Sequence, residues 1–209
     1  MITITDILEC STYLDNIEAV VFDLDDTLYL EKDYVRSGYR AVAAVFPQVG
    51  NMEEKLWAAF QRKLPAIDAV LEVEGIATPE NKALALGTYR SHFPQISLCP
   101  QVAMLLNRLH KEKKLGLITD GRPEGQRAKI QALNLEPYFD KIIVTDELGG
   151  PAFRKPNETA FRLMQKALSV PFEKMVYIGD NMGKDFIAPE KLGMQTICFK
   201  NRDGLYCTE

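Results

Sequence analysis

The sequence predicts an α/β fold: a Rossmann-like parallel sheet with helices on both faces and an all-helical subdomain inserted after the first strand. Three observations support this prediction. Short apolar runs recur along the chain, and segments with helical periodicity separate them in the C-terminal half. These runs are continuously apolar rather than alternating, which is typical of strands buried on both faces of a parallel sheet. No convincing strand occurs between about residues 31 and 97.

The expected strands are short and rich in β-branched residues. They are 18–22 (EAVVF), 115–119 (LGLIT), 141–145 (KIIVT), 175–179 (MVYIG) and 195–199 (QTICF). Helical patterns cover 123–135, 156–168 and a short segment at 188–192, and residues 6–14 form an amphipathic lead. The sheet domain is therefore assigned to residues 1–30 and 98–209.

The inserted segment, residues 31–97, has the spacing of helices. Val35, Tyr39, Val42 and Phe46 recur at helical intervals. The sequence Thr78-Pro79-Glu80 predicts a helix start, because a capping hydroxyl precedes proline at the first helical position and an early acid. The only tryptophan, Trp57, is interpreted as a core residue of this insertion.

Composition limits the classes of function. The chain has 209 residues, of which 46% are hydrophobic and 26% charged, and its net charge of −4 gives no sign of nucleic-acid or acidic-lipid binding. No apolar run reaches the length of a membrane span and no signal peptide is evident, so a cytoplasmic protein is expected. The four cysteines (Cys10, Cys99, Cys198 and Cys207) form no Cys-x-x-Cys pair, and we interpret them as buried or inert thiols.

Polar residues follow four of the expected strands. They are Asp23 and Asp25 after the first, Thr119, Asp120 and Gly121 after the second, Lys155 in the connection after the third, and Asp180 and Asp185 after the fourth. Open parallel sheets bind ligands beyond the carboxyl ends of their strands, so these residues are expected to meet at one edge. A single aspartate after a strand is more often a turn-forming residue than part of a functional site. Considered one by one, Asp26, Asp120 and Asp146 are therefore interpreted as turn-forming residues.

The residue types at this edge indicate a chemistry. A group of aspartates without histidine or cysteine suits a hard cation such as Mg²⁺. A lysine and a threonine hydroxyl at the same edge suit the oxygens of an anion. One carboxylate is able to attack phosphorus and form an acyl-phosphate, and a second carboxyl group two residues along is able to protonate the leaving oxygen and later activate water.

These residues resemble the motifs of the haloacid dehalogenase superfamily. The sequences DLDDT, LITDG, RKP and GDNMGKD are similar to its four motifs and occur in the same order. The resemblance covers the whole sheet domain. It implies a Rossmann-like sheet closed by a small helical cap of the first type, which corresponds to residues 31–97 here.

The resemblance also implies a role for each residue. Asp23 corresponds to the nucleophile and Asp25 to the general acid and base. Thr119 and the amide that follows it, in the turn with Asp120 and Gly121, correspond to the phosphoryl-binding group, and Lys155 stabilises charge on Asp23 and the phosphoryl oxygens. Asp180 corresponds to a Mg²⁺ ligand together with Asp23 and the backbone carbonyl of Asp25. Asp185 orients a metal-bound water, with direct ligation left open, and Arg122 is equally suited to substrate contact or to a surface position.

The expected function is a Mg²⁺-dependent phosphatase for a small phosphorylated metabolite, such as a sugar phosphate or phosphoglycolate, in a monomer or small homo-oligomer that binds neither nucleic acid nor membrane. Asp25 and Asp180 argue against the metal-free dehalogenases of the same superfamily. Phosphonate-cleaving relatives use a cap lysine, but Lys55 and Lys63 read as parts of ordinary charged helix faces. A sugar phosphomutase shares all four motifs and remains an alternative, as does a non-catalytic phosphate-binding module.

Overall fold

The computed structural model describes residues 1–205, which form two compact units. The sheet unit comprises Met1–Glu31 together with the chain from Ser97 onward. The helical unit comprises Lys32–Ile96.

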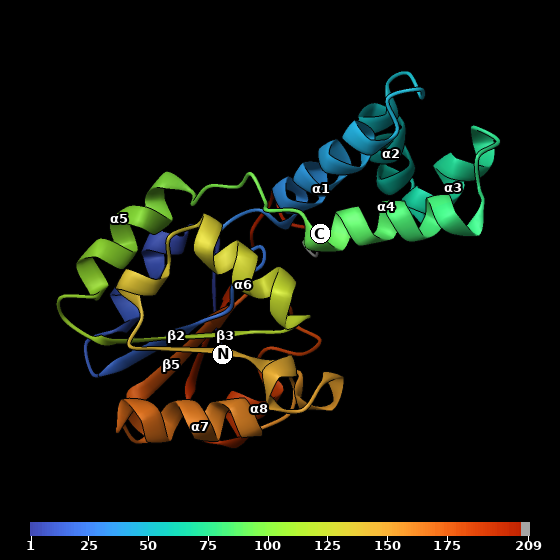
Figure 1. Cartoon of the computed structure of the whole chain (residues 1–209). Helices are drawn as coiled ribbons and strands as arrows, with labels where there is room; N and C mark the ends of the chain where they lie inside the picture. Colours follow the sequence, from blue (N-terminus) through green and yellow to red (C-terminus); the bar gives the residue numbers. More distant parts are fainter. Residues whose placement is uncertain (206–209) are drawn as a thin grey trace. The chain divides into compact units, whose positions relative to one another are not determined.

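The sheet unit contains six parallel strands, which confirms the expected fold class (Figure 1). Their order is β1-β6-β5-β2-β3-β4. The strands are β1 (Ile2–Ile4), β2 (Ala19–Phe22), β3 (Lys114–Thr119), β4 (Lys141–Val144), β5 (Met175–Gly179) and β6 (Gln195–Phe199). Strand β1 was not expected from the sequence. It has three residues and pairs only with β6 at the sheet edge, so it lacks the long apolar run that marks the other strands.

Strand β2 lies at the point where the chain reverses direction across the sheet. The chain runs from β2 to β3 and β4 on one side and then crosses to β5 on the other. Phe22, the last residue of β2, pairs with Leu117 of β3 and Ile178 of β5. Because all three strands are parallel, the loops that follow them emerge next to one another, as expected for a ligand site at a topological switch point.

Helices cover both faces of this sheet, α5 and α6 on one side and α7 and α8 on the other (Figure 1). The helices and 3₁₀ turns of this unit are η1 (Ile7–Tyr13), α5 (Pro100–Leu109), α6 (Pro123–Ala132), η2 (Glu136–Tyr138), η3 (Thr145–Leu148), η4 (Pro151–Phe153), α7 (Thr159–Leu168), η5 (Phe172–Lys174) and α8 (Ile187–Lys191). All four residues of β2 are fully buried because both faces are covered. On the α7 side the ring of Phe161 packs edge-on against Tyr177 with centroids 5.1 Å apart.

Helix α7 begins later than the sequence pattern indicated. The expected helix started at residue 156, but α7 starts at Thr159. The Asn157 side chain accepts a hydrogen bond from the backbone N–H of Thr159 at 2.8 Å, and such a local bond stabilises the turn that precedes a helix.

The helical unit contains four helices among its described residues: α1 (Glu31–Val45), α2 (Met52–Gln61), α3 (Ala66–Val73) and α4 (Pro79–Ser91). Helix α4 starts as expected, since the Thr78 hydroxyl accepts a hydrogen bond from the N–H of Asn81 at 3.2 Å. Trp57 is partly buried against the core of this unit and stacks on Phe60. The assignment of Lys63 to a helix face was wrong: α2 ends at Gln61, and Lys63 adopts a φ of 57° in the following turn.

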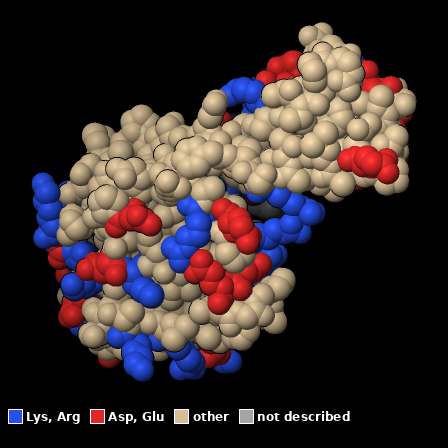
Figure 2. Space-filling model, viewed as in Figure 1, with Lys and Arg blue, Asp and Glu red and all other residues tan. Residues whose placement is uncertain are grey.

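The surface charges and the cysteine thiols say little about the function. On the face shown in Figure 2, basic and acidic residues are interspersed over the sheet unit rather than gathered by sign. Within residues 1–205, no helix has the length and apolar character needed to cross a membrane. Cys10 and Cys198 are buried and Cys99 is half-buried, while Cys207 lies outside the described residues.

Two helical glycines of the helical unit should respond oppositely to alanine. A Cβ atom at Gly38 in α1 would lie 2.5 Å from the Tyr89 ring, whereas a Cβ atom at Gly87 in α4 meets nothing within 4 Å. We predict that Gly38→Ala destabilises the unit by about 1–3 kcal/mol through overpacking. Gly87→Ala should stabilise it by roughly 0.5–1 kcal/mol through helix propensity. Urea denaturation followed by the fluorescence of the only tryptophan, Trp57, reports on this unit. Equal stability of the two variants would contradict the packing of Tyr89 on α1.

Candidate active site

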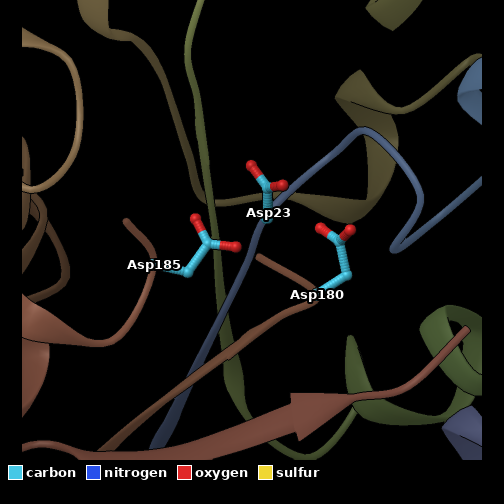
Figure 3. Close-up of side chains that lie close together, drawn as sticks. All are labelled: Asp23, Asp180 and Asp185. Atoms are coloured by element: carbon cyan, nitrogen blue, oxygen red, sulfur yellow. The ribbon is translucent and has the colours of Figure 1, made fainter. Parts of the chain in front are cut away.

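Three aspartate side chains converge at the carboxyl ends of β2 and β5. One carboxylate oxygen from each of Asp23, Asp180 and Asp185 lies within 4.8 Å of those of the other two. Figure 3 shows Asp23 on the loop after β2 and the other two on the loop after β5. Asp23 and Asp185 are buried, and Asp180 is half-buried. The sheet topology therefore brings together acids that lie more than 150 residues apart in the sequence.

Lys155 contacts two of these three acids, Asp23 and Asp185, and is itself buried. Its Nζ is 2.5 Å from Asp23 Oδ1, 2.8 Å from Asp185 Oδ1 and 2.8 Å from the hydroxyl oxygen of Tyr177. Burial alone would lower the pKa of Lys155, but the charges of Asp185 and Asp23 outweigh burial and raise this pKa well above its ordinary value. The ammonium group is therefore held charged between two carboxylates.

Tyr177 was not identified from the sequence. It lies within β5, is fully buried, and accepts a hydrogen bond from Lys155 through its hydroxyl oxygen. The hydroxyl group was the feature that could have identified Tyr177 from the sequence, because a tyrosine in an otherwise apolar buried strand needs a polar partner.

Asp180 carries the least compensated charge of the cluster. Burial, followed by the charges of Asp23 and Asp185, raises the pKa of Asp180 from 3.8 to about 8. Among residues 1–205 its side chain has no hydrogen-bond or ion-pair partner. Burial also raises the pKa of Asp23 to about 6, although Lys155 opposes this effect. Clustered aspartate oxygens without imidazole or thiolate ligands fit a hard divalent cation, which would favour the ionised form of these groups.

Asp185 differs from Asp180 because both of its oxygens contact other groups of the chain. Oδ1 pairs with Lys155, and Oδ2 accepts a hydrogen bond from the backbone N–H of Asn181 at 2.9 Å. Gly179 permits this approach, since a Cβ atom there would lie 2.6 Å from Asp185 Oδ2. Asp185 is therefore fixed in place by its neighbours.

The turn after β3 presents a buried hydroxyl group. Thr119 Oγ1 is buried and has no hydrogen-bond partner in the described part of the chain. Thr119 ends β3, the immediate neighbour of β2, and Gly121 continues the turn with a φ of 138°. A buried hydroxyl without a partner is unfavourable, so this atom is suited to a ligand that enters the site.

Asp120 joins several loops through its carboxylate. Its Oδ1 accepts hydrogen bonds from the Thr145 hydroxyl at 2.8 Å and from the backbone N–H of Lys155 at 3.1 Å. Its Oδ2 lies 3.3 Å from Lys184 Nζ. The Asp120 side chain thus connects the loops that follow β3, β4 and β5. Lys184 was not expected from the sequence to be its partner.

The Asp25 side chain lies outside the group of three acids and has its own set of donors. The Tyr29 hydroxyl donates to Oδ1, Lys129 Nζ lies 2.7 Å from the same oxygen, and Gln126 Nε2 lies 3.1 Å from Oδ2. Burial would raise the pKa of Asp25, but the Lys129 charge and these hydrogen bonds outweigh it and lower the pKa. None of the three donors was identified from the sequence.

Arg122 is exposed at the start of α6. Lys55, considered above as a reactive lysine, pairs instead with Glu74 of its own unit at 2.8 Å.

Comparison with known proteins identifies a matching family and several similar curated proteins. The sequence model of a family described as haloacid dehalogenase-like hydrolase matches residues 20–199. A curated protein of Methanopyrus kandleri named glyceraldehyde 3-phosphate phosphatase is 30% identical over 197 residues, which cover 87% of this chain and 83% of that protein. A protein of the same name from Methanocaldococcus jannaschii is 26% identical over 200 residues, covering 87% and 84%.

A similar fold occurs among solved structures. A hydrolase of the HAD superfamily from Geobacter sulfurreducens, subfamily IA, variant 1, has a TM-score of 0.66 at 16% identity and covers 89% of this chain and 88% of that chain. The matched family segment contains every strand end that supplies a residue to the site. The chain therefore belongs to the family of haloacid dehalogenase-like hydrolases.

Proposed function

We propose that the chain is a Mg²⁺-dependent phosphatase that hydrolyses the monoester of a small sugar phosphate through a phosphorylated Asp23. The observation that carries this proposal is the buried contact between Asp23 and Lys155 beside Asp180, whose carboxyl group has no hydrogen-bond or ion-pair partner among residues 1–205. A nucleophilic carboxylate, a fixed ammonium group and a candidate cation ligand are the groups that phosphoryl transfer needs.

The first half-reaction uses the two oxygens of Asp23 differently. Lys155 is bonded to Oδ1, which leaves Oδ2 to attack phosphorus. The new bond joins Asp23 Oδ2 to phosphorus, while the bond from phosphorus to the ester oxygen breaks and its electron pair stays on that oxygen. Asp25 must carry a proton for this step, although its pKa is lowered in the free protein; the ester oxygen takes that proton from the Asp25 carboxyl group and leaves as an alcohol.

The second half-reaction restores Asp23. The Asp25 carboxylate takes a proton from a water molecule as the water oxygen attacks phosphorus. The bond from phosphorus to Asp23 breaks, and its electron pair returns to the carboxylate. Inorganic phosphate is released, and Asp25 is again protonated for the next cycle.

The remaining groups bind and hold charge. The Thr119 hydroxyl, which lacks a partner in residues 1–205, and the Lys155 ammonium group are suited to the phosphoryl oxygens. Asp23, Asp180 and the backbone carbonyl of Asp25 would hold Mg²⁺, and Asp185 would orient its ligands. When bound, the cation neutralises negative charge that collects on the phosphoryl group and the acids.

A sugar phosphate is the substrate class best supported by the relatives, since two of them are named glyceraldehyde 3-phosphate phosphatase. We propose that the helical unit, Lys32–Ile96, acts as the cap that selects among such substrates. The alternatives from the sequence, a phosphomutase and a non-catalytic binding module, share the same groups at the sheet edge.

A panel of phosphorylated metabolites separates these functions. We predict that the purified protein with Mg²⁺ releases inorganic phosphate from glyceraldehyde 3-phosphate or another small sugar phosphate, and that excess EDTA abolishes release until Mg²⁺ is restored. An isomerised sugar phosphate without net phosphate release would instead identify a mutase. Tight binding of a phosphate ester without turnover would identify a binding module, and full activity in excess chelator would refute the metal.

The two aspartates should fail at different steps. Asp23→Asn removes the nucleophile, so no phosphoprotein should form from any ester. Asp25→Asn removes the acid and base, which matters little for a stable phenolate leaving group but prevents activation of water. With 4-nitrophenyl phosphate, Asp25→Asn should therefore release about one equivalent of nitrophenol in a burst and then stall.

Intact mass spectrometry of the quenched reaction measures the trapped phosphoryl group directly. Wild-type protein under the same quench is the control. Accumulation of phosphoprotein in Asp23→Asn would show that the nucleophile is misassigned. A similar slow steady rate in both variants, without a burst, would argue against a covalent intermediate.

A further inference from the structure

Asp25 is held by donors from two parts of the sheet unit. Lys129 and Gln126 lie three residues apart on α6, so they project from the same face of this helix. Tyr29 lies just after Asp25 in the chain and reaches back to it with its hydroxyl group. The family motifs identified above include none of these donors.

The burial of these donors indicates a specific role. Lys129 is 5% exposed, Gln126 is 6% exposed and Tyr29 is fully buried. Lysine is rarely buried to this extent unless its charge is paired, and a leucine would fill the same face of α6 at no electrostatic cost. The Lys129 ammonium group instead lies 2.7 Å from Asp25 Oδ1.

The donors are divided unequally between the two carboxylate oxygens. Oδ1 accepts from both Tyr29 and Lys129, whereas Oδ2 accepts only from Gln126 within residues 1–205. Each carboxylate oxygen offers about two acceptor positions. Oδ1 is therefore saturated, and Oδ2 keeps one position for a further proton donor.

Gln126 also connects Asp25 to the turn that carries Thr119. Its Nε2 lies 2.5 Å from the carbonyl oxygen of Asp120 and 3.1 Å from Asp25 Oδ2. The turn approaches closely because residue 121 is glycine: a Cβ atom there would lie 2.7 Å from Gln126 Nε2. One amide group thus bridges the candidate acid and base to the candidate phosphoryl-binding turn.

We propose that Lys129 and Gln126 are positioning residues that fix the orientation of Asp25, so that Oδ2 is the oxygen that exchanges a proton with the ester oxygen and with water. This proposal rests on the proposed function and deepens it. In the first half-reaction the proton passes from Oδ2 to the ester oxygen as the bond from phosphorus to that oxygen breaks. In the second it returns to Oδ2 from the attacking water.

The test compares two leaving groups in single turnover. A sugar phosphate needs a proton on its departing oxygen, whereas 4-nitrophenyl phosphate does not. Lys129→Met and Gln126→Leu should therefore lower the ratio of the two phosphorylation rates, sugar phosphate to nitrophenyl phosphate, by about tenfold or more. Lys129→Arg, which keeps a charged donor, should restore part of the ratio.

Arg127→Met is the matched control on the same helix. Arg127 is exposed and pairs with Glu147 at 2.6 Å, and it has no contact with Asp25. This variant should keep the wild-type ratio. The Mg²⁺ concentration for half-maximal activity should also match wild type in Gln126→Leu, because its side chain contacts none of the three clustered acids.

The outcomes separate the two proposals. If wild-type protein cleaves both esters but Lys129→Met and Gln126→Leu slow them equally, the residues are merely structural and the inference is overturned while the proposed function stands. If Lys129→Met does not fold, the ratio in Gln126→Leu decides alone. If wild-type protein cleaves neither ester, the proposed function fails, and the positioning role fails with it.

Discussion

The buried contact between Asp23 and Lys155 is the interaction on which the rest of the site depends. Asp23 follows the central strand of a sheet covered on both faces, so its carboxylate is removed from water and its pKa rises to about 6. Lys155, held by Asp185 and Tyr177, returns positive charge to this position. Breaking a buried pair of this kind leaves an isolated charge, which is strongly destabilising. The fold therefore buries the Asp23 carboxylate at an electrostatic cost and offsets part of that cost with the Lys155 ammonium group.

Lys155 compensates the negative charge of the acids only in part, because several groups share its ammonium group. Its contacts go to Asp23, Asp185 and Tyr177, while Asp180 has no ion-pair partner in the described chain and its pKa rises to about 8. Strand order explains why these groups meet, since β5 and β3 flank β2. A divalent cation would complete the charge balance, and this is the physical reason to expect metal dependence. The charge of Asp25 also contributes to the raised pKa of Asp23, but Asp25 has a cation of its own, since Lys129 Nζ lies 2.7 Å from its Oδ1.

The sequence was most informative where a residue's role is local. Buried strands can be recognised in the sequence as apolar runs, and an aspartate or lysine immediately after such a run can be identified in the same way. Contacts between residues that are far apart in the sequence leave no such pattern. Lys129 contacts Asp25 although more than 100 residues separate them, and nothing in the α6 sequence distinguishes Lys129 from an exposed lysine. Tyr177 looked like an ordinary strand residue, and β1 was too short for its period to be recognised. The roles of the individual site residues remain predictions from the motifs and the geometry.

The most direct test of the central claim measures proton release when Mg²⁺ binds. If burial and neighbouring acids hold Asp180 largely protonated at pH 7, because its pKa is about 8, the cation must displace that proton. Calorimetric titration in buffers of different ionisation enthalpy should then show about one proton released per Mg²⁺ at pH 7 and much less at pH 9. Asp180→Asn should remove the proton release and weaken binding. Mg²⁺ binding without proton release at pH 7, or equal binding by Asp180→Asn, would contradict a cation site that completes the charge of these acids.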